Sequence, residues 1–215
     1  MSDSLEGQRR IVKISIFKIK IIMNCNNKYL NCVGKYSNRE LNNINDIVCN
    51  YKRNCRKGVI KELSFYAEGS LLEAIEKSAM CITSEGKRHN HQRRIPIESL
   101  RKTKNLLKLK CERLKKCQTF EQLYTIVQEI IDPIFKIGPL TIYDITHRIG
   151  IKLKLYPNLV YLHAGTAIGA KLLRLDCSSD TLEISKLPKQ LQGLEPYEIE
   201  DCLCMYQKLK CKMTM

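Results

Sequence analysis

The sequence predicts a mainly α-helical protein, built as one compact helical domain behind an N-terminal segment. Three observations predict this fold class. Apolar residues recur at three- and four-residue steps from Gly58 onward, helix-start signals precede some of these stretches, and strand-like alternation is confined to residues 13–21. A chain of 215 residues is long enough to bury one sizeable core. We therefore expect an N-terminal part over residues 1–57 and a helical domain over residues 58–215.

The N-terminal part differs from the rest in composition. The stretch "KISIFKIKI" alternates apolar residues with Lys and Ser, which predicts one half-buried β-strand. Residues 24–57 are rich in Asn and basic residues and show little apolar periodicity, so we expect an irregular segment. Lysines interrupt the apolar run before it, which makes that run a poor signal-peptide core and too charged to span a bilayer. We therefore expect a cytoplasmic protein that does not enter a membrane.

Five helices are predicted in the helical domain, near residues 69–83, 98–117, 119–131, 139–150 and 196–210. Thr119 and Gln122 have the spacing of a capping box at the start of the third helix, and Asp132-Pro133 ends that helix. Prolines in the first turn favour the starts of the last two helices, at Pro139 and Pro196.

The cysteines and histidines do not form a recognisable metal motif. The eleven cysteines are scattered and include no C-x-x-C pair, so we expect reduced thiols, many of them in the core, and no metal or other cofactor. His89 and His91 could hold a metal with Cys81 or act as acid and base, but neither reading has its carboxylate or thiolate partners at a recognisable spacing. We therefore expect no catalytic residues.

Positive charge is concentrated in one part of the chain. The net charge is +15, and residues 86–117 hold twelve Lys or Arg against two Glu. A cluster of this kind is typical of surfaces that bind a nucleic-acid phosphate backbone, and it includes the loop residues Lys87, Arg88, His89, His91, Arg93 and Arg94. The alternative is a solvated helix face whose lysines reflect the composition of the whole chain.

The stretch "KIGPLTIYDITHRIGIKL", residues 136–153, predicts a tight turn followed by a helix. Gly138 is the residue that we expect to take a positive φ so that the backbone can pass close to a phosphate. Lys136 and Thr141 are expected at the surface of this turn. Ile142, Ile145 and Ile149 form the buried stripe of the helix, and its opposite face carries Thr141, Asp144, His147 and Arg148.

This stretch resembles the hairpin of the helix-hairpin-helix DNA glycosylase superfamily. Gly138 and Thr141 match the second glycine and the threonine of that hairpin, whereas Lys136 stands at the position of its first glycine. Leu140 stands where bifunctional members carry a catalytic lysine, and Tyr161 or Leu162 stands where the catalytic aspartate is expected. The resemblance implies a DNA-binding hairpin without glycosylase chemistry. A plain structural turn is the alternative.

Four further stretches are similar to parts of uncharacterised bacterial proteins: "GKRHNHQRRIP", "IYDITHRIG", "VYLHAGTAIGAKLL" and "EIEDCLCMY". This resemblance implies no activity. The first hypothesis is therefore a nucleic-acid-binding protein, with DNA favoured over RNA, that contacts phosphates through the basic loop and helix and through Lys136, Gly138 and Thr141. The alternatives are a nuclease-like hydrolase that uses His89, His91 or His163, and a protein-interaction domain whose charge reflects composition alone.

Overall fold

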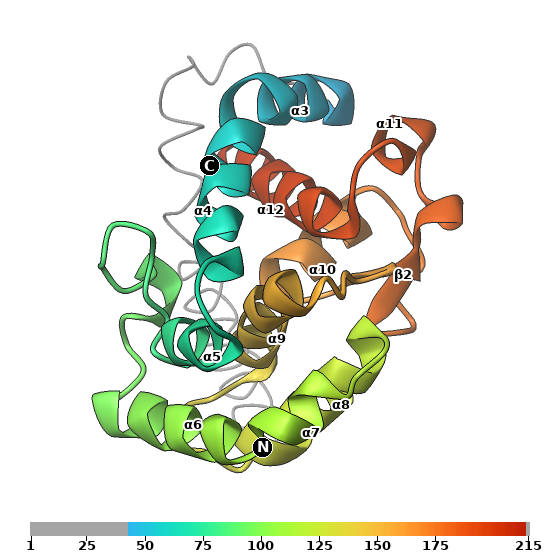
Figure 1. The fold of residues 1–215 in the computed structure, drawn as a ribbon. Helices are drawn as coiled ribbons and strands as arrows, with labels where there is room; N and C mark the ends of the chain where they lie inside the picture. The colour runs from blue at the N-terminus through green and yellow to red at the C-terminus, as the bar shows by residue number, and fades with distance from the viewer. Residues whose placement is uncertain (1–42, 214–215) are drawn as a thin grey trace, which may run out of the picture.

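A computed structural model describes residues 43–213 of the chain, with side chains to residue 208, and these residues are mainly helical (Figure 1). The predicted N-terminal strand and the first part of the irregular segment lie outside the described residues. The elements are α3 (Ile44–Asn50), the π-helical turn η1 (Tyr51–Cys55), α4 (Arg56–Ala67), α5 (Leu71–Ala79), η2 (Asn90–Gln92), α6 (Ile97–Leu109), α7 (Cys111–Lys115), α8 (Phe120–Ile131), α9 (Pro139–Leu153), β1 (Leu159–Tyr161), α10 (Ala164–Leu172), β2 (Thr181–Glu183), η3 (Ile184–Lys186), α11 (Lys189–Gln192) and α12 (Pro196–Met213).

Residues 44–57 are helical, which corrects the prediction of an irregular segment. The side chain of Asn43 caps α3 through a capping box with Asp46, and helical structure then continues through η1 into α4. Ile47 and Tyr51 are fully buried in the same apolar core as Leu203 of α12. A domain boundary between residues 57 and 58 would cut α4. The sequence prediction failed here because the partner of these apolar side chains is distant in the chain.

Two apolar cores lie on either side of α9. One core joins α3, η1 and the start of α4 to α10, α11 and α12, together with the antiparallel pair β1–β2. The other joins α5, α6, α7 and α8 to the Ile142, Ile145 and Ile149 stripe of α9. Figure 1 shows α9 in the middle of the molecule, with α6 and α7 along the lower edge and α12 above. The helix α9 is therefore enclosed on most of its surface.

The predicted helices agree with the structure apart from one break and their exact ends. The predicted helix 98–117 is divided at Lys110 into α6 and α7. Thr119 caps α8 and accepts a hydrogen bond from the backbone N–H of Gln122, as expected. The side-chain oxygen of Gln122, however, accepts from the backbone N–H of Gln118 instead of completing the capping box on Thr119.

The turn before α9 differs from the predicted clamp. Gly138 is the N-cap residue of α9 with an extended φ of −118°, and a Cβ at this position would meet nothing within 4 Å. The positive φ belongs to Lys136, at 64°. Thr141 is 8% exposed and its backbone N–H already donates to the carbonyl of Gly138 at 2.8 Å. The expectation of a strained Gly138 is therefore wrong, since its φ is negative. The expectation of a surface Thr141 is wrong as well, because its side chain is buried and its backbone N–H is already bonded within the turn.

The face of α9 opposite the isoleucine stripe is also buried. Arg148 is 4% exposed and His147 is 7% exposed, and Asp144 is only partly exposed. A polar helix face normally lies toward water. Here other elements cover it with complementary polar groups, and these groups form the candidate site.

Candidate functional site

The loop between α5 and α6 is held in a defined shape by its own backbone. Ile82 and Arg88 form an antiparallel bridge, and the backbone N–H of Thr83 donates to the carbonyl of Lys87 at 2.7 Å. Gly86, at the tip, has a φ of +73°, which a glycine adopts without strain. The Arg88 guanidinium turns back and donates to the carbonyl of Ile95 at 3.1 Å. The basic loop is therefore folded onto itself.

The first anchor of the loop is a contact between His89 and α4. The Tyr66 hydroxyl donates its one proton to the carbonyl of Ile82 at 2.6 Å, so it can only accept from His89 Nε2 at 2.8 Å. His89 therefore carries a proton on Nε2, which also lies 3.5 Å from Glu62 Oε1. Glu62 in turn accepts from the backbone N–H and the hydroxyl of Ser84, at 3.1 and 2.6 Å.

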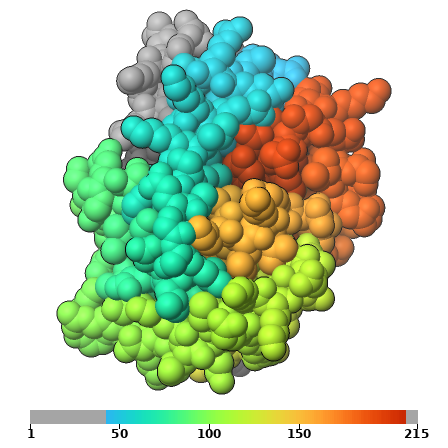
Figure 2. All heavy atoms as spheres, viewed as in Figure 1, coloured from blue at the N-terminus to red at the C-terminus, as the bar shows by residue number. Residues whose placement is uncertain are grey.

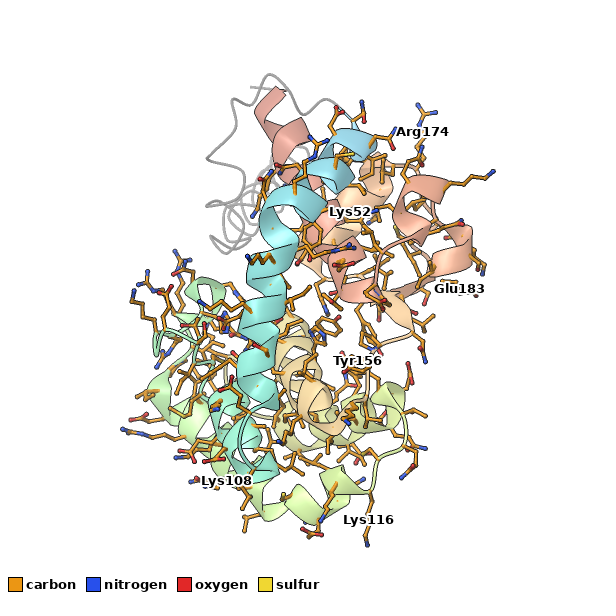
Figure 3. The ribbon with its side chains drawn as sticks, turned by 45° about the horizontal axis from the view of Figure 1, so that its top comes forward. Lys52, Lys108, Lys116, Tyr156, Arg174 and Glu183 are labelled. Atoms are coloured by element: carbon orange, nitrogen blue, oxygen red, sulfur yellow. The ribbon has the colours of Figure 1, made fainter. Side chains whose placement is uncertain are left out.

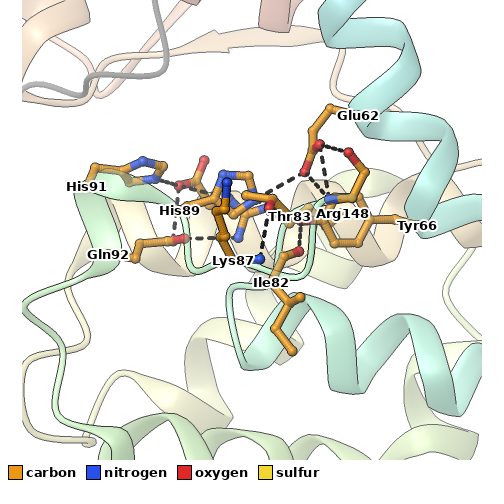
Figure 4. A network of polar contacts seen from close by, with 11 residues as sticks. Glu62, Tyr66, Ile82, Thr83, Lys87, His89, His91, Gln92 and Arg148 are labelled. Carbon is orange, nitrogen blue, oxygen red and sulfur yellow. Dashed lines mark hydrogen bonds and ion pairs between the residues drawn. The ribbon is translucent and has the colours of Figure 1, made fainter.

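The second anchor joins the loop to the polar face of α9 (Figure 4). His91 Nε2 and Gln92 Nε2 both bond Asp144 Oδ2, the latter at 3.1 Å. The Arg148 guanidinium donates to Gln92 Oε1 at 3.1 Å and lies 3.6 Å from the Asp144 carboxylate. Gln92 donates an N–H to Asp144 and the Arg148 guanidinium faces the same carboxylate, so a His91 tautomer with its proton on Nε2 completes the set of donors around Asp144.

The Arg148 guanidinium is the buried charge around which this network is arranged. Its side chain is 5% exposed, and it lies over the ring of Tyr66 with 5.6 Å between the guanidinium carbon and the ring centre. A buried cation that loses its partners costs several kcal/mol. The network of Glu62, Tyr66, His89, His91, Gln92, Asp144 and Arg148 therefore fixes the loop to two helices.

The pair of His91 and Asp144 has the form of a general base, but its free nitrogen is shielded. His91 Nδ1 is buried and has no hydrogen-bond partner among the described residues, and the whole side chain is 5% exposed. A base must lie within hydrogen-bond reach of the proton that it takes. Cys81, which is also buried here, is no nucleophile, because burial raises the pKa of its thiol to about 11. The geometry therefore favours anchoring over catalysis.

The structure separates the predicted loop residues into two groups. His89 and His91 are buried anchors, which does not fit the expectation that they contact a phosphate, and the partly exposed Arg88 donates to backbone carbonyls. Lys87, Arg93 and Arg94 are exposed. Lys87 is paired with Glu85 at 3.1 Å, whereas Arg93 and Arg94 make no side-chain ion pair within residues 43–208.

The helices α6 and α7 extend this basic surface along one edge of the molecule. Acidic partners neutralise part of it: Glu76 pairs with Lys104 and Lys108 at 3.4 and 3.2 Å, and Glu129 pairs with Arg113 at 2.7 Å. Figure 3 shows Lys108 and Lys116 along this edge, and Figure 2 shows the loop adjoining it. Between residues 88 and 117, the exposed cations without an ion pair to another described residue are Arg93, Arg94, Lys102, Lys110, Lys115 and Lys116. We call these six residues the basic edge.

A second buried cluster covers the other side of α9 and is mostly aromatic. The ring of Tyr143 lies 4.9 Å from Tyr161 and 4.8 Å from His163, and it stacks on His147 at 5.8 Å. Glu200 of α12 is 8% exposed and accepts the backbone N–H of Tyr161 at 3.0 Å. This cluster therefore joins α9 to β1, to the start of α10 and to α12.

Burial shifts the pKa values in this aromatic cluster. Desolvation lowers the pKa of His163 to about 4, so its imidazole is neutral at neutral pH, and its Nε2 has no hydrogen-bond partner among the described residues. Desolvation also raises the pKa of Glu200 well above the usual range. Both shifts have the direction expected for titratable groups in a dry, aromatic interior.

Replacing Glu200 by Gln tests this protonation state. An acid whose pKa is raised by folding stabilises the protein fully below its unfolded pKa, and that stability is lost as pH rises through the folded pKa. Gln mimics the protonated form and keeps an acceptor for the Tyr161 N–H. We therefore expect Glu200→Gln to be at least as stable as wild type at pH 8, with less loss of stability between pH 5 and pH 8 in urea titrations.

Glu200→Ala is the control, because it removes the acceptor and should be less stable at every pH. A lower stability of Glu200→Gln at pH 8 would show that Glu200 is ionised.

The sequence prediction of the site missed Glu62, Tyr66 and Glu200. Glu62 and Tyr66 are four residues apart on α4 and share one face, a spacing that can be read from the sequence, but nothing in the sequence shows that the loop meets that face.

Comparisons with protein-family models, with curated proteins and with solved structures each find no match to this chain. Among the described residues no three His, Cys, Asp or Glu side chains are grouped to hold a metal ion. No helix between residues 43 and 213 has the length and apolar character to cross a bilayer.

Proposed function

We propose that this protein binds nucleic acid by contacting the phosphate backbone with the basic edge. The observation that supports the proposal is the fixed presentation of Arg93 and Arg94 beside the cations of α6 and α7. A loop held by buried hydrogen bonds presents its cations without a large ordering cost on binding. Cations that only reflect the high Lys and Arg content of the chain would not need a loop that buried hydrogen bonds hold in place. The helix-hairpin-helix resemblance adds Lys136 to the proposed contacts, whereas Gly138 and Thr141 shape the turn.

A charge-matched comparison tests this proposal. We expect the triple variant Arg93→Gln, Arg94→Gln, Lys102→Gln to bind a DNA duplex more weakly at low salt. The slope of log affinity against log salt concentration should fall by about one for each phosphate that the variant no longer neutralises. The control variant is Lys57→Gln, Lys61→Gln, Lys189→Gln, which removes the same charge from other exposed positions.

Two outcomes would contradict the proposal. Equal losses of affinity in the two triple variants would mean that only the total charge matters. Unchanged binding in the first variant would assign the basic edge to composition and would favour a protein-interaction domain. Fluorescence anisotropy across a series of salt concentrations distinguishes these results, and circular dichroism checks that all variants are folded.

A further inference from the structure

The turn between α8 and α9 presents an aromatic ring to solvent. Phe135 is 70% exposed. Ile134, the preceding residue, is 5% exposed, and Ile137, two residues further on, is 7% exposed. The backbone N–H of Ile137 also donates to the carbonyl of Ile134 at 3.0 Å. Phe135 is therefore held outward by a turn that is fixed to the core.

A cation accompanies the ring. Lys136 follows with a φ of 64°, a conformation that is uncommon for residues other than glycine, and its Nζ lies 5.4 Å from the centre of the Phe135 ring. This local backbone conformation directs Phe135 and Lys136 to the surface while Ile137 returns to the core. The turn thus pairs a flat apolar face with a positive charge.

The helix that leads into this turn, α8, packs against the basic helix α7. Arg113 of α7 pairs with Glu129 of α8 at 2.7 Å, six residues before Phe135. Leu114 of α7 and Ile134 of the turn belong to the same apolar core. Lys115 and Lys116 of the basic edge are exposed at the end of the same helix α7.

We propose that Phe135 is a stacking platform for an unpaired base, and that the preferred ligand of the basic edge is therefore a single-stranded nucleic acid. This inference rests on the proposed function. Aromatic side chains beside a cationic surface bind single strands because every unpaired base has a face that can stack, whereas the bases of a duplex already stack on one another. The phosphates contact the cations and one base covers Phe135. The stacked base carries no sequence specificity.

Three variants at one position test the stacking role. Phe135→Leu keeps an apolar side chain but loses the flat ring, and Phe135→Tyr and Phe135→Trp keep it. We expect Phe135→Leu to bind an unstructured single-stranded oligonucleotide about 10-fold more weakly, within the range measured for one stacked base. Phe135→Tyr and Phe135→Trp should bind as wild type. Binding of a duplex of the same length should be unchanged in all three, and so should the melting temperature.

The outcomes separate this inference from the proposed function. If Phe135→Leu binds single strands as wild type does, the stacking role is overturned, while weaker binding by the Arg93, Arg94 and Lys102 variant still supports binding by the basic edge. An equal loss of affinity for single strands and duplexes would also overturn it. Vesicles of anionic lipid are the remaining probe: if Phe135→Leu loses binding to vesicles and keeps binding to single strands, the ring contacts a membrane surface instead.

Discussion

Replacing Gly169 by Ala should lower the free energy of unfolding by about 3 kcal/mol or more, because the methyl group has no space. A Cβ at this position would lie 2.1 Å from the carbonyl oxygen of Leu203 and 2.7 Å from its carbonyl carbon. These are backbone atoms of α12, so no side chain can move aside. The close approach of α10 to α12 at Gly169 is therefore required for the core that also holds Ile47 and Tyr51.

Gly58 provides the matched control for this prediction. It also lies in a helix, α4, but a Cβ there would meet nothing within 4 Å. Alanine has a higher helix propensity than glycine, so Gly58→Ala should raise the free energy of unfolding by about 0.5–1 kcal/mol. Urea titrations followed by circular dichroism measure both variants. Similar effects of the two substitutions would show that α10 and α12 are not in this close contact.

Replacing Arg148 by Met should lower the free energy of unfolding by about 3–5 kcal/mol, the usual cost of removing one partner of a buried ion pair. The variant leaves Gln92 Oε1 without its donor and Asp144 without its nearest arginine. The loop should then detach more readily from α9. Trypsin cleaves after arginine, so cleavage at Arg93 and Arg94 should be faster in the variant than in wild type at equal protease concentration.

Arg101→Met is the control for Arg148→Met. Arg101 is on the surface of α6, with its side chain 62% exposed and 3.5 Å from Glu98. Removing an exposed arginine changes stability by about 0.5 kcal/mol at most. If Arg148→Met were as mild as Arg101→Met, the polar network would not hold the loop, and the basic edge would not be presented in a fixed shape.

The apolar periodicity predicted the core helices because it reports a local property. The isoleucine stripe of α9 and the capping threonine of α8 were identified from neighbouring residues, and both are confirmed. The break at Lys110 was not predicted, since the apolar stripe runs on from α6 into α7 and both Leu107 and Leu114 are fully buried. The residues of η1 were missed because asparagines and lysines surround their apolar positions and α12 covers them.

The sequence by itself determined that the described part of the chain is mainly helical, that α9 buries an isoleucine stripe, and that positive charge gathers between residues 86 and 117. Only the tertiary structure decided which polar side chains are buried. A polar face has the same sequence pattern whether it meets water or a complementary polar surface, and its partners are distant: His91 and Asp144 are 53 positions apart. For the same reason only the fold showed that His89 and His91 anchor the loop and that Arg93 and Arg94 remain exposed.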